Sequence, residues 1–314
     1  MRWWLMTSLL VVAGCLPGDL RPEPGELLIE AEASDDVREG FVTDDGWTLR
    51  FDRFVTTLAG LGLGDDVFDQ NCIDYSSSAY GRLFDFSVAD TSKLNLHYGL
   101  GNCTLRYRIG SPRENTLLTP GTTEADRELM RLPRDDDGLF VRGGDGSVLE
   151  GVGLLLEGSA IRDGDRKDFR WLIRQNQAIT RCFDAERNPF KVRLGSGDTE
   201  VRRARIRPRE LFRLFWEPDE PIVFAHFAAS DADGDGVVTL EEMENVVLMA
   251  EPILSTLLGD LVNQLPEATR NGRLTLREVL EKTLFPRLAS FVGASACEFA
   301  ISDITIQSVD RPGE

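Results

Sequence analysis

A run of acidic residues and glycines has the residue types and spacing of a calcium ligand set. From Asp231 to Glu242 the sequence reads Asp-Ala-Asp-Gly-Asp-Gly-Val-Val-Thr-Leu-Glu-Glu. The carboxylates of Asp231, Asp233 and Asp235 fall on alternate residues, and Glu242 closes the run. Calcium takes about six to eight oxygen ligands, which a chain that wraps round the ion can supply from alternate residues. The run therefore predicts a calcium site.

The same run resembles the calcium loop of the EF-hand superfamily, with glycine at loop position 6 and glutamate at position 12. At position 6, Gly236 allows the positive φ that only glycine adopts freely. By this resemblance Val237 offers its carbonyl oxygen, Thr239 binds directly or through a water, and Glu242 gives two oxygens. Val238 would pair in a short strand with a partner loop. The alternative is a solvated acidic turn that binds no ion.

The residues on both sides of the loop are compatible with helices. Residues 220–230 can form an entering helix, because their apolar positions repeat at helical spacing. Beyond the loop, Met243, Val246 and Val247 repeat the apolar positions of an exiting EF-hand helix. We therefore expect residues 216–298 to form a helical EF-hand segment.

A second stretch, 267–278, aligns with the first loop but has lost most of its ligands. It shares Gly272, Thr275, Leu276 and Glu278 with the first loop. Thr269 and Asn271 replace two of the aspartates, and arginines stand inside the loop. Two interpretations are open: a structural partner loop that binds no ion, and an ordinary helix-loop-helix. We do not expect calcium there.

The whole chain is acidic and has the composition of a globular protein. Its 314 residues are 42% hydrophobic and 28% charged, which fits one or two folded domains. The net charge of −18 argues against nucleic acid and anionic membrane surfaces as partners, because both attract basic patches. The one basic concentration lies between Arg202 and Arg209. It fits either an anionic-ligand patch or the solvated face of a strand.

Residues 26–215 have the alternating pattern of β-strands. From Trp47 to Phe51, for example, every second residue is apolar. Residues 216–298 have helical patterns, and 299–309 could form a strand that returns to the body. We therefore expect an α+β fold: a β-rich, sandwich-like body with a helical EF-hand segment near the C-terminus.

The N-terminus has the pattern of a bacterial lipoprotein signal. Its apolar run is too short to span a bilayer. The run ends in Leu-Val-Val-Ala-Gly before Cys15, which resembles the lipobox, where the cysteine thiol receives a diacylglyceryl group. We expect a signal peptide over 1–14, lipidation of Cys15 and a tether over 15–25; a soluble secretory signal is the alternative. Leu16 is not the aspartate associated with inner-membrane retention, which favours the outer membrane.

Four cysteines remain in the exported chain after Cys15. They are Cys72, Cys103, Cys182 and Cys297. An even number of cysteines in an exported protein indicates disulfides, here with three possible connectivities. We favour Cys72–Cys103 and Cys182–Cys297, because each pair then lies within one region of the pattern. Free buried thiols are the alternative.

One further stretch supports the lipoprotein interpretation. The sequence Asp45-Gly-Trp-Thr-Leu-Arg-Phe-Asp-Arg-Phe54 resembles the DGW…FDRF stretch of uncharacterised bacterial lipoproteins. Those proteins also place an EF-hand-like loop late in the chain. The resemblance covers most of the mature chain and implies a β-rich exported lipoprotein, but it implies no activity.

Residues for familiar catalytic sites are scarce. The chain has two histidines, His97 and His226, so a Ser-His-Asp triad or a histidine-rich zinc site has little to build from. The sequence also contains no GxSxG, P-loop or GxGxxG stretch. Carboxylates are abundant, but nothing in the sequence selects two of them as an acid pair, and we expect no catalytic residues.

These observations predict a calcium-binding, lipid-anchored lipoprotein of the cell envelope with a structural or ligand-binding role. Its partners would be the calcium ion, the membrane through the lipid anchor, and an envelope ligand or protein. The runner-up is a calcium-dependent hydrolase acting on envelope or extracellular polymer, which needs a deep cleft with converging carboxylates. A calcium sensor would need two matched loops.

Overall fold

The computed structural model describes eight stretches of the chain. They are residues 22–64, 71–75, 80–88, 91–135, 139–142, 149–213, 221–250 and 273–301. The predicted signal peptide and Cys15 lie outside these residues. So does the first half of the second loop, 267–272.

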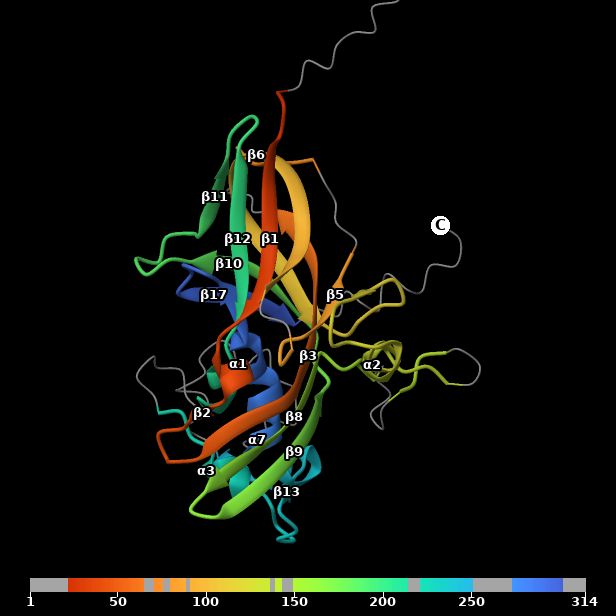
Figure 1. Ribbon diagram of the computed structural model, residues 1–314, viewed down its shortest axis with the longest axis vertical. Helices are drawn as coiled ribbons and strands as arrows, with labels where there is room; N and C mark the ends of the chain where they lie inside the picture. The colour runs from red at the N-terminus through yellow and green to blue at the C-terminus, as the bar shows by residue number, and fades with distance from the viewer. Residues whose placement is uncertain are drawn as a thin grey trace, which may run out of the picture.

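Fifteen strands of the described residues join one hydrogen-bonded sheet (Figure 1). Its main path runs through β13 (Val237–Val238), β9 (Asp165–Ile173), β8 (Leu154–Arg162), β3 (Thr48–Leu63), β6 (Thr91–Gly110), β1 (Gly25–Ala33), β12 (Thr199–Ile206) and β16 (Ala289–Phe291). Beside this path lie β2 (Phe41–Val42), β4 (Ile73–Asp74), β5 (Arg82–Asp85), β7 (Leu117–Leu118), β10 (Gln177–Phe183), β11 (Lys191–Leu194) and β17 (Ala296–Ile301).

Two long strands, β3 and β6, curl the sheet into a half-barrel. The first part of β3 pairs with β8 and its last part with β6, and β6 in turn pairs with β1 near its start and β10 near its end. The register of β3 shifts between Ala59 and Gly62, where Gly60 has a φ of 60°. Such a bulge bends the strand. The predicted sandwich-like body is therefore wrong, because one continuous sheet curls where two packed sheets were expected.

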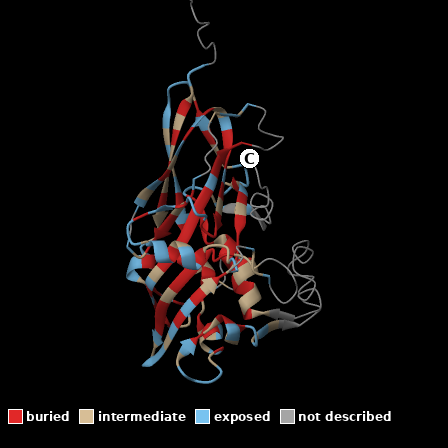
Figure 2. Ribbon diagram, turned by 90° about the vertical axis from the view of Figure 1, so that its right-hand side faces the viewer, coloured by how far each residue is buried: buried red, intermediate tan, exposed pale blue. Residues whose placement is uncertain are grey.

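An aromatic cluster forms the centre of the core at the β8–β9 end of the sheet. Its buried members are Phe41, Trp47, Phe51, Phe54, Phe169, Trp171, Phe212, Phe224 and Phe227. Neighbouring rings lie between 4.8 and 6.3 Å apart, centroid to centroid. Figure 2 shows buried positions interspersed with less buried ones along the strands, and in β1 buried and intermediate residues alternate over most of its length. The alternation follows from the two-residue period of a strand, which turns one face inward.

The helices among the described residues are short. They are α1 (Asp36–Glu39), α2 (Glu124–Met130), α3 (Ala225–Ala228), α4 (Leu240–Met243) and α7 (Leu276–Val279), with the 3₁₀ and π turns η1 (Pro208–Phe212), η3 (Leu280–Leu284) and η4 (Phe285–Arg287). In the described part of the chain, none has the length and apolar character of a membrane span.

The expected helical EF-hand segment is absent from the described residues. Strands make up 48% of the structure and helices 16%, so the predicted α+β class is also wrong. In place of the exiting helix, β14 (Val247–Ala250) pairs antiparallel with β15 (Arg273–Thr275). Adjacent β-branched residues, Val246 and Val247, are restricted at χ1 and favour extended chain. Pairing with β15 then gives that extended chain its hydrogen bonds.

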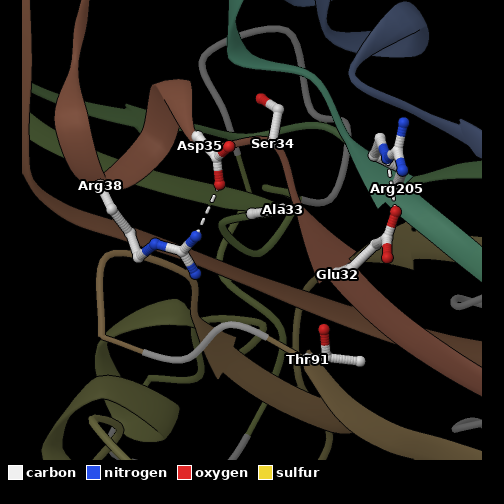
Figure 3. Close-up of a pocket in the computed structure, with 7 residues that line it drawn as sticks. All are labelled: Glu32, Ala33, Ser34, Asp35, Arg38, Thr91 and Arg205. Atoms are coloured by element: carbon white, nitrogen blue, oxygen red, sulfur yellow. Dashed lines mark hydrogen bonds and ion pairs between the residues drawn. The ribbon is translucent and has the colours of Figure 1, made fainter.

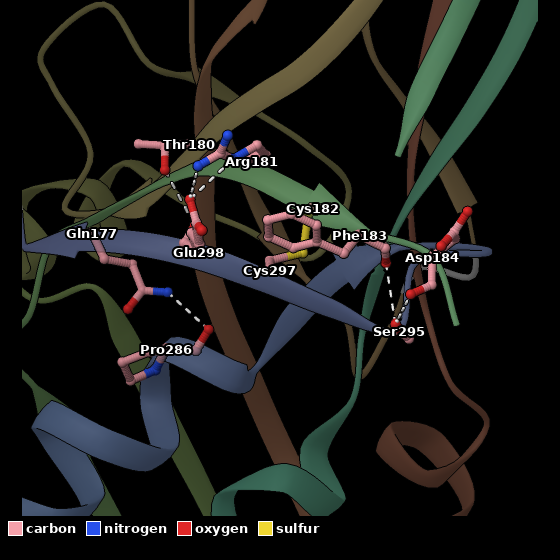
Figure 4. The surroundings of a disulfide bond; sticks show 10 residues. All are labelled: Gln177, Thr180, Arg181, Cys182, Phe183, Asp184, Pro286, Ser295, Cys297 and Glu298. Carbon is pink, nitrogen blue, oxygen red and sulfur yellow. Dashed lines mark hydrogen bonds and ion pairs between the residues drawn. A yellow bond between two sulfur atoms is a disulfide. The ribbon is translucent and has the colours of Figure 1, made fainter. Parts of the chain in front are cut away.

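Both favoured disulfides are present, Cys72–Cys103 and Cys182–Cys297. Cys182 on β10 lies in register with Cys297 on β17, as Figure 4 shows. The second bond therefore fastens the last described strand to the half-barrel. Of the returning strand expected over 299–309, residues 299–301 belong to β17 and the others lie outside the described residues.

The arginine-rich stretch pairs with acidic residues of the neighbouring strand. β1 and β12 are parallel, and Arg203 donates to Glu30 at 2.9 Å. Arg205 pairs with Glu32 one step further along. This ladder of exposed ion pairs supports the interpretation as a solvated strand face.

The FDRF part of the DGW…FDRF stretch contributes to an ion cluster where β3, β5 and α2 meet. Arg53 Nη1 lies 2.7 Å from Asp126 Oδ1, and Arg53 Nε lies 3.3 Å from Asp85 Oδ2. Asp126 Oδ2 also accepts the backbone N–H and the hydroxyl of Thr123, the N-cap of α2, both at 2.8 Å. The hydrogen bond from Arg53, more than any other contact, lowers the pKa of Asp126, although burial opposes the shift.

We predict that Asp126→Asn destabilises the fold by about 2 to 3 kcal/mol, because Arg53 loses its closest partner in a largely buried site.

The wild-type protein should also lose stability as the pH falls from the ordinary aspartate value of 3.8 toward the lowered pKa of Asp126. A carboxylate with a lowered pKa stabilises the fold only while it is ionised. Thermal unfolding followed from about pH 7 to about pH 3 measures both effects. An unchanged acid dependence in Asp126→Asn would contradict the assignment.

Candidate calcium loop

The three aspartates of the predicted loop converge in the structure. Ligand oxygens of Asp231, Asp233 and Asp235 lie within 4.8 Å of one another. Glu242 spans the two ends of the loop: its Oε1 accepts the N–H of Ala232 at 3.2 Å, and its Oε2 accepts the N–H of Thr239 at 2.9 Å. The structure thus brings together three of the four side-chain carboxylates that the sequence analysis selected, and Glu242 links the two ends of the loop through backbone hydrogen bonds. An all-oxygen donor set of this kind fits a hard cation such as calcium.

Backbone N–H groups hold the aspartates in their convergent arrangement. Asp231 accepts the N–H of Gly234 at 2.8 Å and that of Gly236 at 3.1 Å. Asp235 accepts the N–H of Val237 at 2.7 Å. Gly236 has a φ of 84°, the left-handed conformation required at loop position 6. The loop is therefore shaped by its own backbone, which turns the carboxylates toward a common centre.

A lysine from the sheet contacts the first residue of the loop. Lys167 Nζ lies 2.7 Å from Asp231 Oδ2 and 3.6 Å from Asp165 Oδ1. The hydrogen bond from Lys167 is the main cause of the lowered pKa of Asp231, and the same bond raises the pKa of Lys167. The sequence analysis missed Lys167, because no local pattern links it to a loop that lies far along the chain.

The short strand inside the loop pairs with the sheet. β13 runs parallel to β9, with Val237 opposite Asp168 and Val238 opposite Phe169. The carbonyl oxygen of Val238 also accepts the indole N–H of Trp171 at 2.9 Å. The expectation that Val238 would pair with a partner loop is therefore wrong, and the edge strand of the half-barrel takes that place.

The second loop contributes no partner strand to the first within the described residues. Its β15 pairs with β14, downstream of the first loop. Thr275 and Glu278 form a capping box at the start of α7, as Thr239 and Glu242 do at α4. A Thr-x-x-Glu capping box accounts for much of the likeness between the two loops without any metal.

The Asp-Asp-Gly turn before β3 holds the segment that leads into the loop. Asp45 Oδ2 accepts the N–H of Ala225 at 2.7 Å and that of Phe224 at 3.1 Å, at the start of α3. Asp44 Oδ2 accepts the N–H of Ile222 at 2.7 Å. A carboxylate at the start of a helix satisfies N–H groups that have no intrahelical partner. This role explains the aspartate of the DGW motif, which the sequence analysis used only as part of a resemblance.

Aromatic packing completes the docking of this segment. The ring of Phe224 lies 5.3 Å from Trp47 and 6.1 Å from Phe169, and Phe227 lies 5.4 Å from Trp171. Phe224 and Phe227 are both completely buried. Each large apolar side chain buried in this way contributes about 1.5 to 3 kcal/mol. The loop is thus attached to a rigid part of the core.

The clefts in the described part of the chain do not favour the hydrolase alternative. A cleft of about 390 Å³ between β1, α1 and β12 contains Glu32 and Asp35 (Figure 3). Glu32 pairs with Arg205, and Asp35 pairs with Arg38 at 2.8 Å. Each carboxylate therefore has a basic partner, and the two do not form a catalytic acid pair. A second cleft of about 580 Å³ has one carboxylate, Glu114, in its lining.

The histidines also lie apart from any catalytic arrangement that the sequence could suggest. His97 is completely buried in β6, and His226 lies on α3.

The chain matches no protein-family model, and no curated protein or solved structure matches it. The assignment of function therefore depends on the loop and its surroundings.

We predict that Asp45→Ala destabilises the protein by about 1 kcal/mol, because two N–H groups at the start of α3 lose their acceptor. Asp52→Ala is the matched control, since Asp52 is exposed on β3 in the same motif. Chemical unfolding of both variants tests this, and equal stabilities would refute the capping role of Asp45.

Proposed function

We propose that this protein is a calcium-binding, lipid-anchored lipoprotein of the cell envelope, in which calcium has a structural role. The observation that carries the proposal is the convergence of the ligand oxygens of Asp231, Asp233 and Asp235. Glu242 accepts the N–H of Ala232 and so lies near the start of the same loop. The ion would be held by these four side chains, by the carbonyl oxygen of Val237 and by Thr239. Calcium would supply the positive charge that offsets the repulsion among four carboxylates.

The position of the loop supports a structural role over a switching role. The loop segment is fastened to the half-barrel by Asp45, by buried aromatic rings and by the pairing of β13 with β9. A calcium sensor needs an element with two arrangements, and a segment held at three places offers little freedom to change. Calcium binding should therefore strengthen the attachment of residues 221–243 to the sheet edge.

We predict that Glu242→Gln removes most of the calcium-dependent stabilisation and that Glu278→Gln changes little. Both glutamates occupy the same position of a capping box, and glutamine can form the same capping hydrogen bonds. Comparison of the two variants therefore isolates the role of Glu242 as a calcium ligand. For a lone site we expect a Kd on the order of 10⁻⁵ to 10⁻³ M. At about 100 times Kd, calcium should add about 2.7 kcal/mol to the stability of the wild-type protein.

Isothermal titration calorimetry and thermal unfolding, each with calcium and with chelator, measure these effects. Equal losses in Glu242→Gln and Glu278→Gln would mean that both loops bind calcium. Failure of the wild-type protein to bind calcium would refute the proposed function. A large opening on calcium binding, measured by small-angle scattering, would favour the sensor.

The lipid anchor is proposed from the lipobox before Cys15. Two disulfides suit an exported protein. The strand that follows the tether, β1, begins at the end of the molecule opposite β13 (Figure 1). With the anchor at Cys15 in the outer membrane, the calcium loop would then face away from the bilayer toward an envelope ligand or protein.

We predict that Cys15→Ala abolishes lipid labelling and leaves the protein unprocessed or soluble, because the diacylglyceryl group has no other thiol to join at that site. Incorporation of radiolabelled palmitate in cells, followed by membrane fractionation, measures this. Equal labelling of the wild-type protein and the variant would refute the lipoprotein assignment.

A further inference from the structure

We propose that Lys167 acts as an internal counter-cation that sets the calcium affinity of the loop. The ammonium group stabilises the loop in the absence of calcium and weakens the binding of the ion. This inference rests on the proposed calcium function and adds a residue outside the loop that regulates the site.

The first observation is the contact itself. Lys167 Nζ lies 2.7 Å from Asp231 Oδ2, and the side chain of Asp231 is completely buried while that of Lys167 is 16% exposed. Salt screens an ion pair less when water is excluded from it. The lysine charge therefore acts at close range on a carboxylate that calcium would need at loop position 1.

The second observation is that the sheet fixes the position of Lys167. Its backbone lies opposite Ala160 in the antiparallel pair of β8 and β9. The next residue, Asp168, donates its N–H to the carbonyl oxygen of Gly236 inside the loop at 2.8 Å. The same strand thus holds both the loop backbone and Lys167. The contact between Lys167 and Asp231 is therefore fixed by β9 and is not the chance contact of a mobile surface side chain.

The neighbouring arginine provides a contrast. Arg166 pairs with Asp168 at 2.6 Å, and its side chain is 56% exposed. Its charge is the same as that of Lys167, and it stands one residue away, but its partner is outside the ligand set. Arg166 is therefore a matched control for the effect of charge alone.

Two roles for Lys167 predict opposite effects on calcium affinity. A counter-cation repels calcium, so its removal strengthens binding. A hydrogen-bond donor that orients Asp231 for the ion supports the ligand, so its removal weakens binding. We infer the first role, because a full positive charge beside the site opposes a divalent cation at every distance, and backbone N–H groups of Gly234 and Gly236 already orient Asp231.

The test compares the wild-type protein, Lys167→Met and Arg166→Met by calorimetric titration with calcium chloride and by thermal unfolding in chelator. We expect Lys167→Met to bind calcium about tenfold more tightly and to have a lower Tm in chelator. Arg166→Met should stay within about twofold of the wild-type affinity. Methionine keeps the length of the lysine stem, so packing along β9 is retained.

Each outcome separates this inference from the proposed function. Calcium binding by the wild-type protein with equal or weaker binding by Lys167→Met overturns the role of Lys167 and leaves the calcium function standing. Binding by Lys167→Met alone overturns the proposed calcium function of the wild-type protein, and shows that the lysine charge opposes the ion. No binding by any of the three proteins overturns both.

Discussion

The packing of Phe224 and Phe227 against the aromatic residues of the half-barrel is the interaction on which the rest of this site depends. Both rings are completely buried, and they contact Trp47, just before β3, and side chains from β9 and η1. Phe224 is the N-cap of α3 and Phe227 lies on it; this helix has four residues and is too short to be stable alone. Its conformation is therefore imposed by packing, and the loop that follows takes its position from the same contacts.

Around this packing the protein distributes its charges in two different ways. On the β1–β12 face, acidic and basic side chains alternate across strands and neutralise one another, as in the pair of Arg203 with Glu30. In the loop, by contrast, the carboxylates of three aspartates meet, and Lys167 contacts one of them, Asp231. An excess of like charge at one place is costly unless a cation joins it. The loop therefore concentrates negative charge that the β1–β12 face neutralises in pairs.

The short strand of the loop pairs with the main sheet, where the sequence analysis expected a partner loop. In this protein the strand of the loop, β13, pairs with a long strand of the main sheet. That strand continues into β8 through a hairpin, and β8 pairs with β3 over most of its length. The loop is therefore joined to the half-barrel through a continuous series of paired strands.

The sequence by itself determined the features that depend on local spacing. The alternate carboxylates at 231, 233 and 235 converge because one short turn brings them together, and Gly236 permits that turn. Both favoured disulfide pairs are present, but the sequence left three connectivities open, and Cys182 and Cys297 lie in different predicted segments. Only the tertiary structure decided that the segment around Val247 is a strand, that β13 pairs with β9, and that Lys167 contacts Asp231. These are contacts between residues far apart in the chain, and no periodic pattern in the sequence indicates which distant residues will meet.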